Sequence, residues 1–359
     1  MTQRKGGRRR EIIHLALLCL VILQLVILGR IWDSPITPDA SWEPRGLVNP
    51  MWEIFKLLMI SVGPAYFLLS ANSPLMQTWF HRTSPNKSPY VLYALSNIGS
   101  LLGLITYPIF VEPQFTVEQQ GIFWAVGFGL FALWAAIGTI RIARLKTDVD
   151  QTVDANPEPE RKPSPSLVRA LWLLLSACAS ILYLATTSPI TQDVAVIPFL
   201  WVLPLTIYLL TFIFAFSSEK WYSRQIFLVL FFLASIAFVW ALYAGPTLGL
   251  PLQLIVYSIA LFIACMVCHG ELYRLRPDPA YLTNFYLMVS IGGALGGIFV
   301  NFVAPYLFRG YWELPLGMIF VWVLLFMIMT FRPLPRRSRS VYLLNQTLML
   351  SGVILFGIL

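Results

Sequence analysis

The strongest constraint on this chain is a series of apolar segments, most of them about 20 residues long, separated by short polar connections. An α-helix rises 1.5 Å per residue, so about 20 apolar residues cross a hydrocarbon core of about 30 Å. Inside lipid, an isolated segment can satisfy its own backbone hydrogen bonds only as a helix. The pattern therefore predicts an all-α polytopic membrane protein.

Composition supports this class. Of the 359 residues, 58% are apolar and only 12% are charged, and the mean hydropathy is +0.72. Soluble domains carry roughly 25% charged residues, so a water-soluble globular protein is excluded. The net charge of +8 does not indicate nucleic-acid binding, because the basic residues gather at the ends of the apolar segments.

Eleven transmembrane helices are predicted. They cover approximately residues 12–32, 50–70, 89–111, 120–142, 167–186, 194–216, 223–244, 248–270, 282–307, 312–331 and 341–359.

Basic residues alternate between the two sides of this arrangement. The N-terminal arm, residues 1–11, and the five connections that follow the even-numbered spans hold 21 of the 25 Lys and Arg. By the positive-inside rule the N-terminus is cytoplasmic. The polar, Pro-rich segment 147–166 predicts a cytoplasmic linker between spans one to four, residues 12–146, and spans five to eleven, residues 167–359.

The third and ninth predicted spans, residues 89–111 and 282–307, match each other at a constant offset of 193 residues. The ninth span follows the third by six places, so the two run in the same direction, as in the parallel six-helix repeat of major-facilitator-type transporters. Gly-x-x-x-Gly patterns also arise wherever membrane helices pack closely, so duplication and packing stay open as alternatives. The matched pairs are Tyr93 with Tyr286, Ile98 with Ile291, Gly99 with Gly292, Leu102 with Leu295, and Gly103 with Gly296. The glycines expected to pack against other helices are Gly99, Gly103, Gly292, Gly293, Gly296 and Gly297.

The stretch CMVCH, Cys265 to His269, fits the C-x-x-C-H pattern of covalent haem attachment. Such attachment takes place outside the cytoplasm, whereas the charge pattern puts this end of the eighth span inside. We therefore reject Cys265 and Cys268 as haem or metal ligands, expect no cofactor, and interpret both thiols as helix-packing groups.

The ionisable residues beside these cysteines are stronger candidates. Charged groups at the end of a membrane helix are costly unless they are paired or face water, so His269, Glu271, Arg274 and Arg276 are candidate residues of a pathway or gate. The alternative for Glu271 is a structural pair with Arg274 three residues later. Asp193 and Asn97 are further pathway candidates, and their alternatives are a helix cap and an interhelical hydrogen bond.

Four stretches of the chain resemble a bacterial family of fused major-facilitator/spermidine-synthase-like proteins. They are SVGPAYFLLSANSPLMQTWF, YVLYALSNIGSLLGLITYPIFVEP, TSPITQDVAVIPFLWVLPLTIYLLTFIFAFS and CMVCHGELYRLRPDPAYLTNFYLMVSIGGALGGIFVNFVAPYLF. The resemblance places Cys268–Leu272, Arg276–Pro277 and Gly292–Gly293 in the family pattern. It implies a multi-pass protein of the bacterial inner membrane.

Members of that family usually carry further spans before the first one here, and they continue into a soluble aminopropyltransferase-like domain. This chain ends at Leu359, so we expect a split gene or a fragment, and no enzymatic activity from the chain itself. The sequence predicts a module that transports or channels a small, polyamine-like solute or anchors a synthase partner. The alternative is a non-transporting scaffold subunit of a larger membrane complex.

Overall fold

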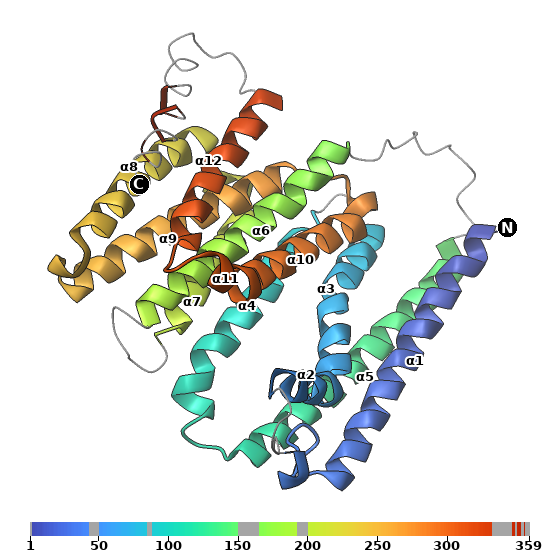
Figure 1. The fold of residues 1–359 in the computed structure, drawn as a ribbon. Helices are drawn as coiled ribbons and strands as arrows, with labels where there is room; N and C mark the ends of the chain where they lie inside the picture. The colour runs from blue at the N-terminus through green and yellow to red at the C-terminus, as the bar shows by residue number, and fades with distance from the viewer. Residues whose placement is uncertain are drawn as a thin grey trace. The chain divides into compact units, whose positions relative to one another are not determined.

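The computed structural model describes residues 2–42, 50–84, 88–149, 165–191 and 200–331, together with residues 347, 348, 350–352 and 355. Within these ranges the regular secondary structure is helical and contains no strand (Figure 1). The prediction of an all-α polytopic membrane protein is confirmed. The helices form two compact units. Met1–Trp79 and Thr106–Arg161 make up the first, and Phe80–Ile105 and Lys162–Leu359 make up the second.

In the described part of the first unit there are three long α-helices and a short one. Their bounds are α1 Thr2–Ile31, α2 Pro50–Ser61, α3 Gly63–Thr83, which reaches into the second unit after Trp79, and α5 Val117–Val149. A small apolar core lies between α1, α3 and α5. Its side chains recur at helical spacing, which puts them on one face of each helix. They are Leu18, Val21 and Leu25, then Ala65 and Leu68, then Phe128, Ala132 and Ala135.

The predicted second span is broken into α2 and α3, which meet at an angle of 62°. Pro64 follows Gly63 directly at the start of α3, and proline offers no backbone N–H to continue the hydrogen bonding of α2. Glu53 and Lys56, one turn apart on α2, form an ion pair at 3.2 Å.

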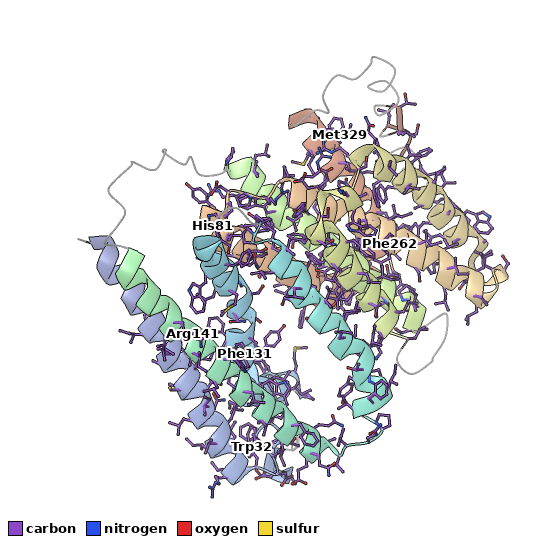
Figure 2. All side chains as sticks on the ribbon, turned by 180° about the vertical axis from the view of Figure 1, so that it is seen from behind. Trp32, His81, Phe131, Arg141, Phe262 and Met329 are labelled. Carbon is purple, nitrogen blue, oxygen red and sulfur yellow. The ribbon has the colours of Figure 1, made fainter. Side chains whose placement is uncertain are left out.

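The second unit holds the larger core and most of the helices. Their bounds are α4 Val91–Thr106, α6 Ser166–Pro189, α7 Val202–Ser217, α8 Arg224–Ala244, α9 Leu250–Arg274, α10 Leu282–Ile298, α11 Ala304–Leu307 and α12 Glu313–Phe331. In Figure 1, α6 lies between α9 and α10, and it contacts both. Half-buried side chains such as Phe262 on α9 and Met329 on α12 pack around this core (Figure 2).

Among the described residues, eight helices are long and apolar enough to cross a membrane, and each corresponds to one predicted span. The α2–α3 pair would be a ninth span. The sixth predicted span contains α7, which has 16 residues, and its first part lies outside the described residues. The predicted span 341–359 and the linker 147–166 also lie largely outside them, so the count of eleven stays a prediction.

Serine and glycine residues hold α6 against α10. Ser176 and Ser180, one turn apart on α6, donate to the carbonyl oxygens of Val289 at 2.7 Å and Gly293 at 2.9 Å. A Cβ atom at Gly296 would lie 2.5 Å from the carbonyl oxygen of Ala177. The helices can therefore approach this closely only because glycine has no side chain here.

The six glycines singled out in the sequence differ in their surroundings. A Cβ at Gly292 would overlap the carbonyl oxygen of Leu173, as at Gly296, whereas a Cβ at Gly297 would make an ordinary contact with Leu184. A Cβ would have no neighbour within 4 Å at Gly99, Gly103 or Gly293. The two matched segments of the predicted repeat thus differ in packing.

Tyr93 and Tyr286, also matched in the repeat, lie against each other with ring centroids 4.8 Å apart. Because a twofold-related pair can meet in this way only at its axis, the contact is compatible with a parallel repeat of α4 and α10. The repeat stays a prediction.

We predict that Gly292→Ala destabilises the protein while Gly293→Ala does not. The methyl group of the first variant overlaps the α6 backbone, and such overpacking costs about 1–3 kcal/mol. The second variant adds a methyl group in open space and raises helix propensity. Thermal unfolding in detergent micelles measures both, and equal melting temperatures for the two variants would contradict the proposed α6–α10 packing.

Candidate functional site

Helix α9 packs against α6, α7, α8 and, less extensively, α12. Its segment from Ile263 to Tyr273 is buried throughout. Successive residues on a helix point about 100° apart, so neighbours in the CMVCHGELY stretch face different helices. The sequence motif is therefore a set of contacts between helices rather than one face of a pocket.

Glu271 is paired with Arg224, the first residue of α8. The Arg224 Nε donates to Oε1 of the carboxylate at 2.6 Å, and Nη2 donates to Oε2. The Tyr222 hydroxyl donates to Oε1 as well, at 2.9 Å. The side chains of Arg224 and Glu271 are only 4% and 0% exposed. This bidentate geometry matches the planar guanidinium to the carboxylate, which is why arginine suits a buried ion pair.

This partner differs from the one suggested by the sequence. Arg274, three residues after Glu271, is exposed at the end of α9, and the ion pair forms with Arg224 instead. The reason is that Glu271 faces α8. Its carboxylate is buried away from water there, and Arg224 is the basic residue that reaches it. Arg224 forms a bidentate pair that satisfies both oxygens of the buried carboxylate.

Gly270 allows Tyr222 to reach the carboxylate. A Cβ atom at Gly270 would overlap the Tyr222 ring, so the phenol lies directly on the α9 backbone. Burial and the neighbouring Glu271 carboxylate raise the pKa of Tyr222 well above its ordinary value. The phenol consequently stays protonated and keeps donating to Glu271.

His269 points toward α7 rather than α8. Its Nδ1 lies 2.9 Å from the Thr211 hydroxyl, and its ring stacks on Phe212 with centroids 3.6 Å apart. The Tyr208 ring meets it edge-on at 5.1 Å. The side chain is fully buried.

The hydrogen bonds of Thr211 assign the tautomer of His269. The Thr211 hydroxyl donates its one proton to the carbonyl oxygen of Tyr208 at 2.7 Å. Its oxygen must then accept from Nδ1, so the imidazole proton is on Nδ1 and Nε2 carries a lone pair. Among the described residues this Nε2 has no hydrogen-bond partner. An unsatisfied buried group of this kind costs about 1–3 kcal/mol.

The turn after α9 is held by three other residues. The indole of Trp172 donates to the carbonyl oxygen of Leu275 at 2.9 Å, and the Tyr90 hydroxyl donates to that of Pro277 at 2.6 Å. Arg276 lies 3.8 Å above the Tyr273 ring and donates to Glu219 at 2.6 Å. Glu219 is 73% exposed, so this pair sits at the surface, unlike Arg224–Glu271.

Cys265 and Cys268 are fully buried against α6. The Cys265 thiol lies 4.0 Å from the carbonyl oxygen of Ala179, and both thiols belong to the main apolar core. Within the part of the chain that the structure describes, no three His, Cys, Asp or Glu residues come together as a metal site.

The remaining candidates do not join this cluster. The Asn97 amide donates to the carbonyl oxygen of Tyr93 on its own helix at 2.8 Å, rather than to another helix. Asp193 lies outside the described residues.

Sequence reasoning missed Arg224, Tyr222 and Thr211. Arg224 was counted only as one of the basic residues of a connection, although it is the first residue of a long apolar helix. A charge at such a position was the available signal, because it must be paired wherever the helix end is buried. Nothing in the sequence distinguishes Thr211 from the other hydroxyl residues of the spans.

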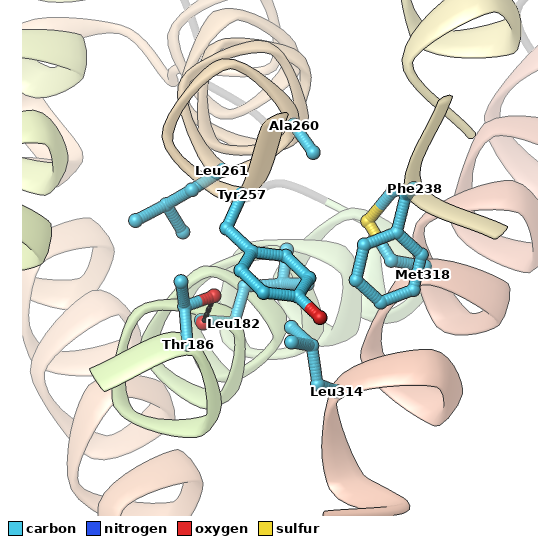
Figure 3. Close-up of a pocket in the computed structure, with 8 residues that line it drawn as sticks. All are labelled: Leu182, Thr186, Phe238, Tyr257, Ala260, Leu261, Leu314 and Met318. Atoms are coloured by element: carbon cyan, nitrogen blue, oxygen red, sulfur yellow. Dashed lines mark hydrogen bonds between the residues drawn. The ribbon is translucent and has the colours of Figure 1, made fainter. Parts of the chain in front are cut away.

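A small apolar cavity lies elsewhere in the unit, between α6, α8, α9 and α12 (Figure 3). Its volume of about 10 Å³ is at the lower limit for one water molecule. The Tyr257 ring projects into it beside Thr186, whose hydroxyl is bonded to its own helix at 2.7 Å. The cavity is separate from Glu271 and His269.

No family model, curated protein or solved structure matches this chain. The arrangement itself is therefore the basis for any functional argument: a buried ion pair that is fully engaged, and a buried imidazole with one bare nitrogen.

We predict that Glu271→Gln lowers stability by about 3–5 kcal/mol, because it leaves the Arg224 charge buried without a counter-charge. The double variant Arg224→Met with Glu271→Met should recover most of that loss. Glu219→Gln, which breaks the exposed pair with Arg276, should cost less than about 1 kcal/mol. The melting temperatures of these variants are compared by thermal unfolding in micelles. If Glu271→Gln and the double variant were destabilised equally, the pairing would be refuted.

Tyr222→Phe keeps the ring against Gly270 but removes the donor to Glu271, at a cost of roughly 1.5–3 kcal/mol. The raised pKa of Tyr222 adds a pH dependence. In the unfolded chain the phenol ionises near 10, and in the folded one it ionises later. The wild type's advantage over Tyr222→Phe is thus complete below pH 10 and shrinks as the pH rises further. An advantage that grows above pH 10 would contradict this.

Proposed function

We propose that this chain is a multi-pass membrane module that anchors a partner protein, and that its second unit does not carry a solute through the membrane. The observation that supports this is the complete engagement of Glu271 by Arg224 and Tyr222. The carboxylate was the leading candidate for a gate or relay, and here it acts as a structural clamp.

A gating ion pair must break when two parts of a transporter move apart. Arg224 and Glu271 are instead on consecutive helices that pack against each other along their length and are joined by residues 245–249. They belong to one compact unit, so a motion of that unit leaves the pair closed. A clamp of this kind serves a scaffold better than a gate.

We further propose that the chain is the membrane half of the fused major-facilitator/spermidine-synthase-like family. Its partner would then be a soluble aminopropyltransferase-like protein. The support is the sequence resemblance, which includes Cys268–Leu272. The charge alternation supports an orientation in the bacterial inner membrane in which the Arg274 end of α9 faces the cytoplasm, where such a partner would reside.

Transport of a small cation such as a polyamine is the second candidate. It is favoured by the 62° break between α2 and α3, since broken helices build substrate sites in many transporters. The Tyr93–Tyr286 contact adds support for a transporter-like repeat.

One experiment separates the two candidates. The full chain is reconstituted in proteoliposomes with radiolabelled spermidine, and in parallel it is affinity-purified from cross-linked native membranes. Anchoring predicts no flux above that of protein-free liposomes, together with co-purification of a protein that shows aminopropyltransferase activity. Spermidine flux that is lost in Glu271→Gln and His269→Ala but kept in Glu219→Gln would overturn the anchoring proposal and favour transport.

A further inference from the structure

Nε2 of His269, which has no hydrogen-bond partner among the described residues, has no part in the proposed anchoring function. The Thr211 hydroxyl holds the imidazole in one tautomer, so the Nε2 lone pair is a fixed acceptor inside the second unit. We propose that this nitrogen accepts a hydrogen bond from a lipid-soluble molecule that carries a hydroxyl group on an aromatic ring, the chemical class of the quinols.

We take the ligand to be neutral, because among the described residues no unpaired acidic side chain is found in contact with His269. The carboxylate closest in sequence, Glu271, is neutralised by Arg224. Thr211 bonds to the imidazole of His269, and the Phe212 and Tyr208 rings contact it; none of these three side chains is charged. A protonated amine at Nε2 would be a charge within a membrane-spanning unit without a partner, which is costly. A neutral hydroxyl donor satisfies Nε2 without that cost.

The ligand is aromatic because aromatic rings surround the imidazole. Tyr208 and Phe212 contact His269, and their rings also contact those of Tyr183 and Tyr93 at 4.8 Å and 5.5 Å. Aromatic rings attract further rings in edge-to-face and offset-stacked arrangements. A flat, substituted ring can thus pack on this cluster while its hydroxyl reaches Nε2.

Entry of a ligand requires one of the rings around His269 to move. His269 has no exposed surface, whereas Tyr93, Tyr183 and Tyr208 are each half-buried. The half-buried Tyr208 ring, which contacts His269 edge-on, is the ring that must turn aside to admit the proposed ligand. Since α7 and α9 are apolar helices of the membrane domain, the ligand arrives through the lipid.

Tetramethylhydroquinone and its dimethyl ether form a matched pair of probes, because they share a ring and differ in the hydroxyl donor. The full chain in lipid nanodiscs carries ¹⁵N-labelled histidine, and the Nε2 signal of His269 is assigned with His269→Phe. We expect a deprotonated, unbonded Nε2 that shifts on titration with the hydroquinone under anaerobic conditions. The ether should bind at least about tenfold more weakly, the effect of one hydrogen bond of about 1.4 kcal/mol.

His269→Phe keeps an aromatic ring and should bind both probes equally. Thr211→Val, which releases Nδ1, should reduce the preference for the hydroquinone while the protein stays folded. Equal binding of both probes to the wild type, or no binding of either, overturns the proposal. It also fails if Nε2 is hydrogen-bonded before any probe is added, since a water molecule then occupies the position. None of these outcomes depends on a partner protein, so they leave the anchoring proposal untouched.

Discussion

The carboxylate of Glu271 is buried away from water, and the contacts around it compensate for the cost of burying its charge. An isolated charge in such an environment costs several kcal/mol, so it persists only with a counter-charge and with its remaining lone pairs satisfied. Arg224 supplies two donors and Tyr222 a third. These contacts fix the start of α8 and the connection before it against the end of α9. Gly270 is part of the same solution, because any larger residue would displace Tyr222.

The other residues of the motif extend this role to the remaining neighbours of α9. Cys265 packs on α6, and His269 stacks on α7. Trp172 then binds the carbonyl of Leu275 just after the helix ends. Each residue type suits its neighbour: small thiols allow a close helix approach, and a flat imidazole fits an aromatic face. What resembles a cofactor-attachment sequence is therefore a compact set of helix contacts, with one polar atom, Nε2 of His269, left over.

Much of the fold could be predicted from the sequence, because the length of an apolar run determines whether it can cross a membrane. Eight predicted spans correspond to long helices, and Pro64 marks the break in another. The partner of Glu271 could not be predicted, since Arg224 is 47 residues away and only packing brings it close. Likewise, the sequence does not tell Gly292, which lies against α6, from Gly293, which faces open space. That difference depends on how α10 is rotated about its axis.

Glu271 is clamped by Arg224 across the α8–α9 contact. Magic-angle-spinning NMR of the full chain in lipid bilayers tests it directly, by dipolar transfer between the carboxyl carbon of Glu271 and guanidinium nitrogens. We expect a strong cross-peak with Arg224, which binds through two nitrogens, and none with the exposed Arg274. A cross-peak with Arg274 in place of Arg224, or a Glu271 carboxyl group with no guanidinium neighbour, would contradict it.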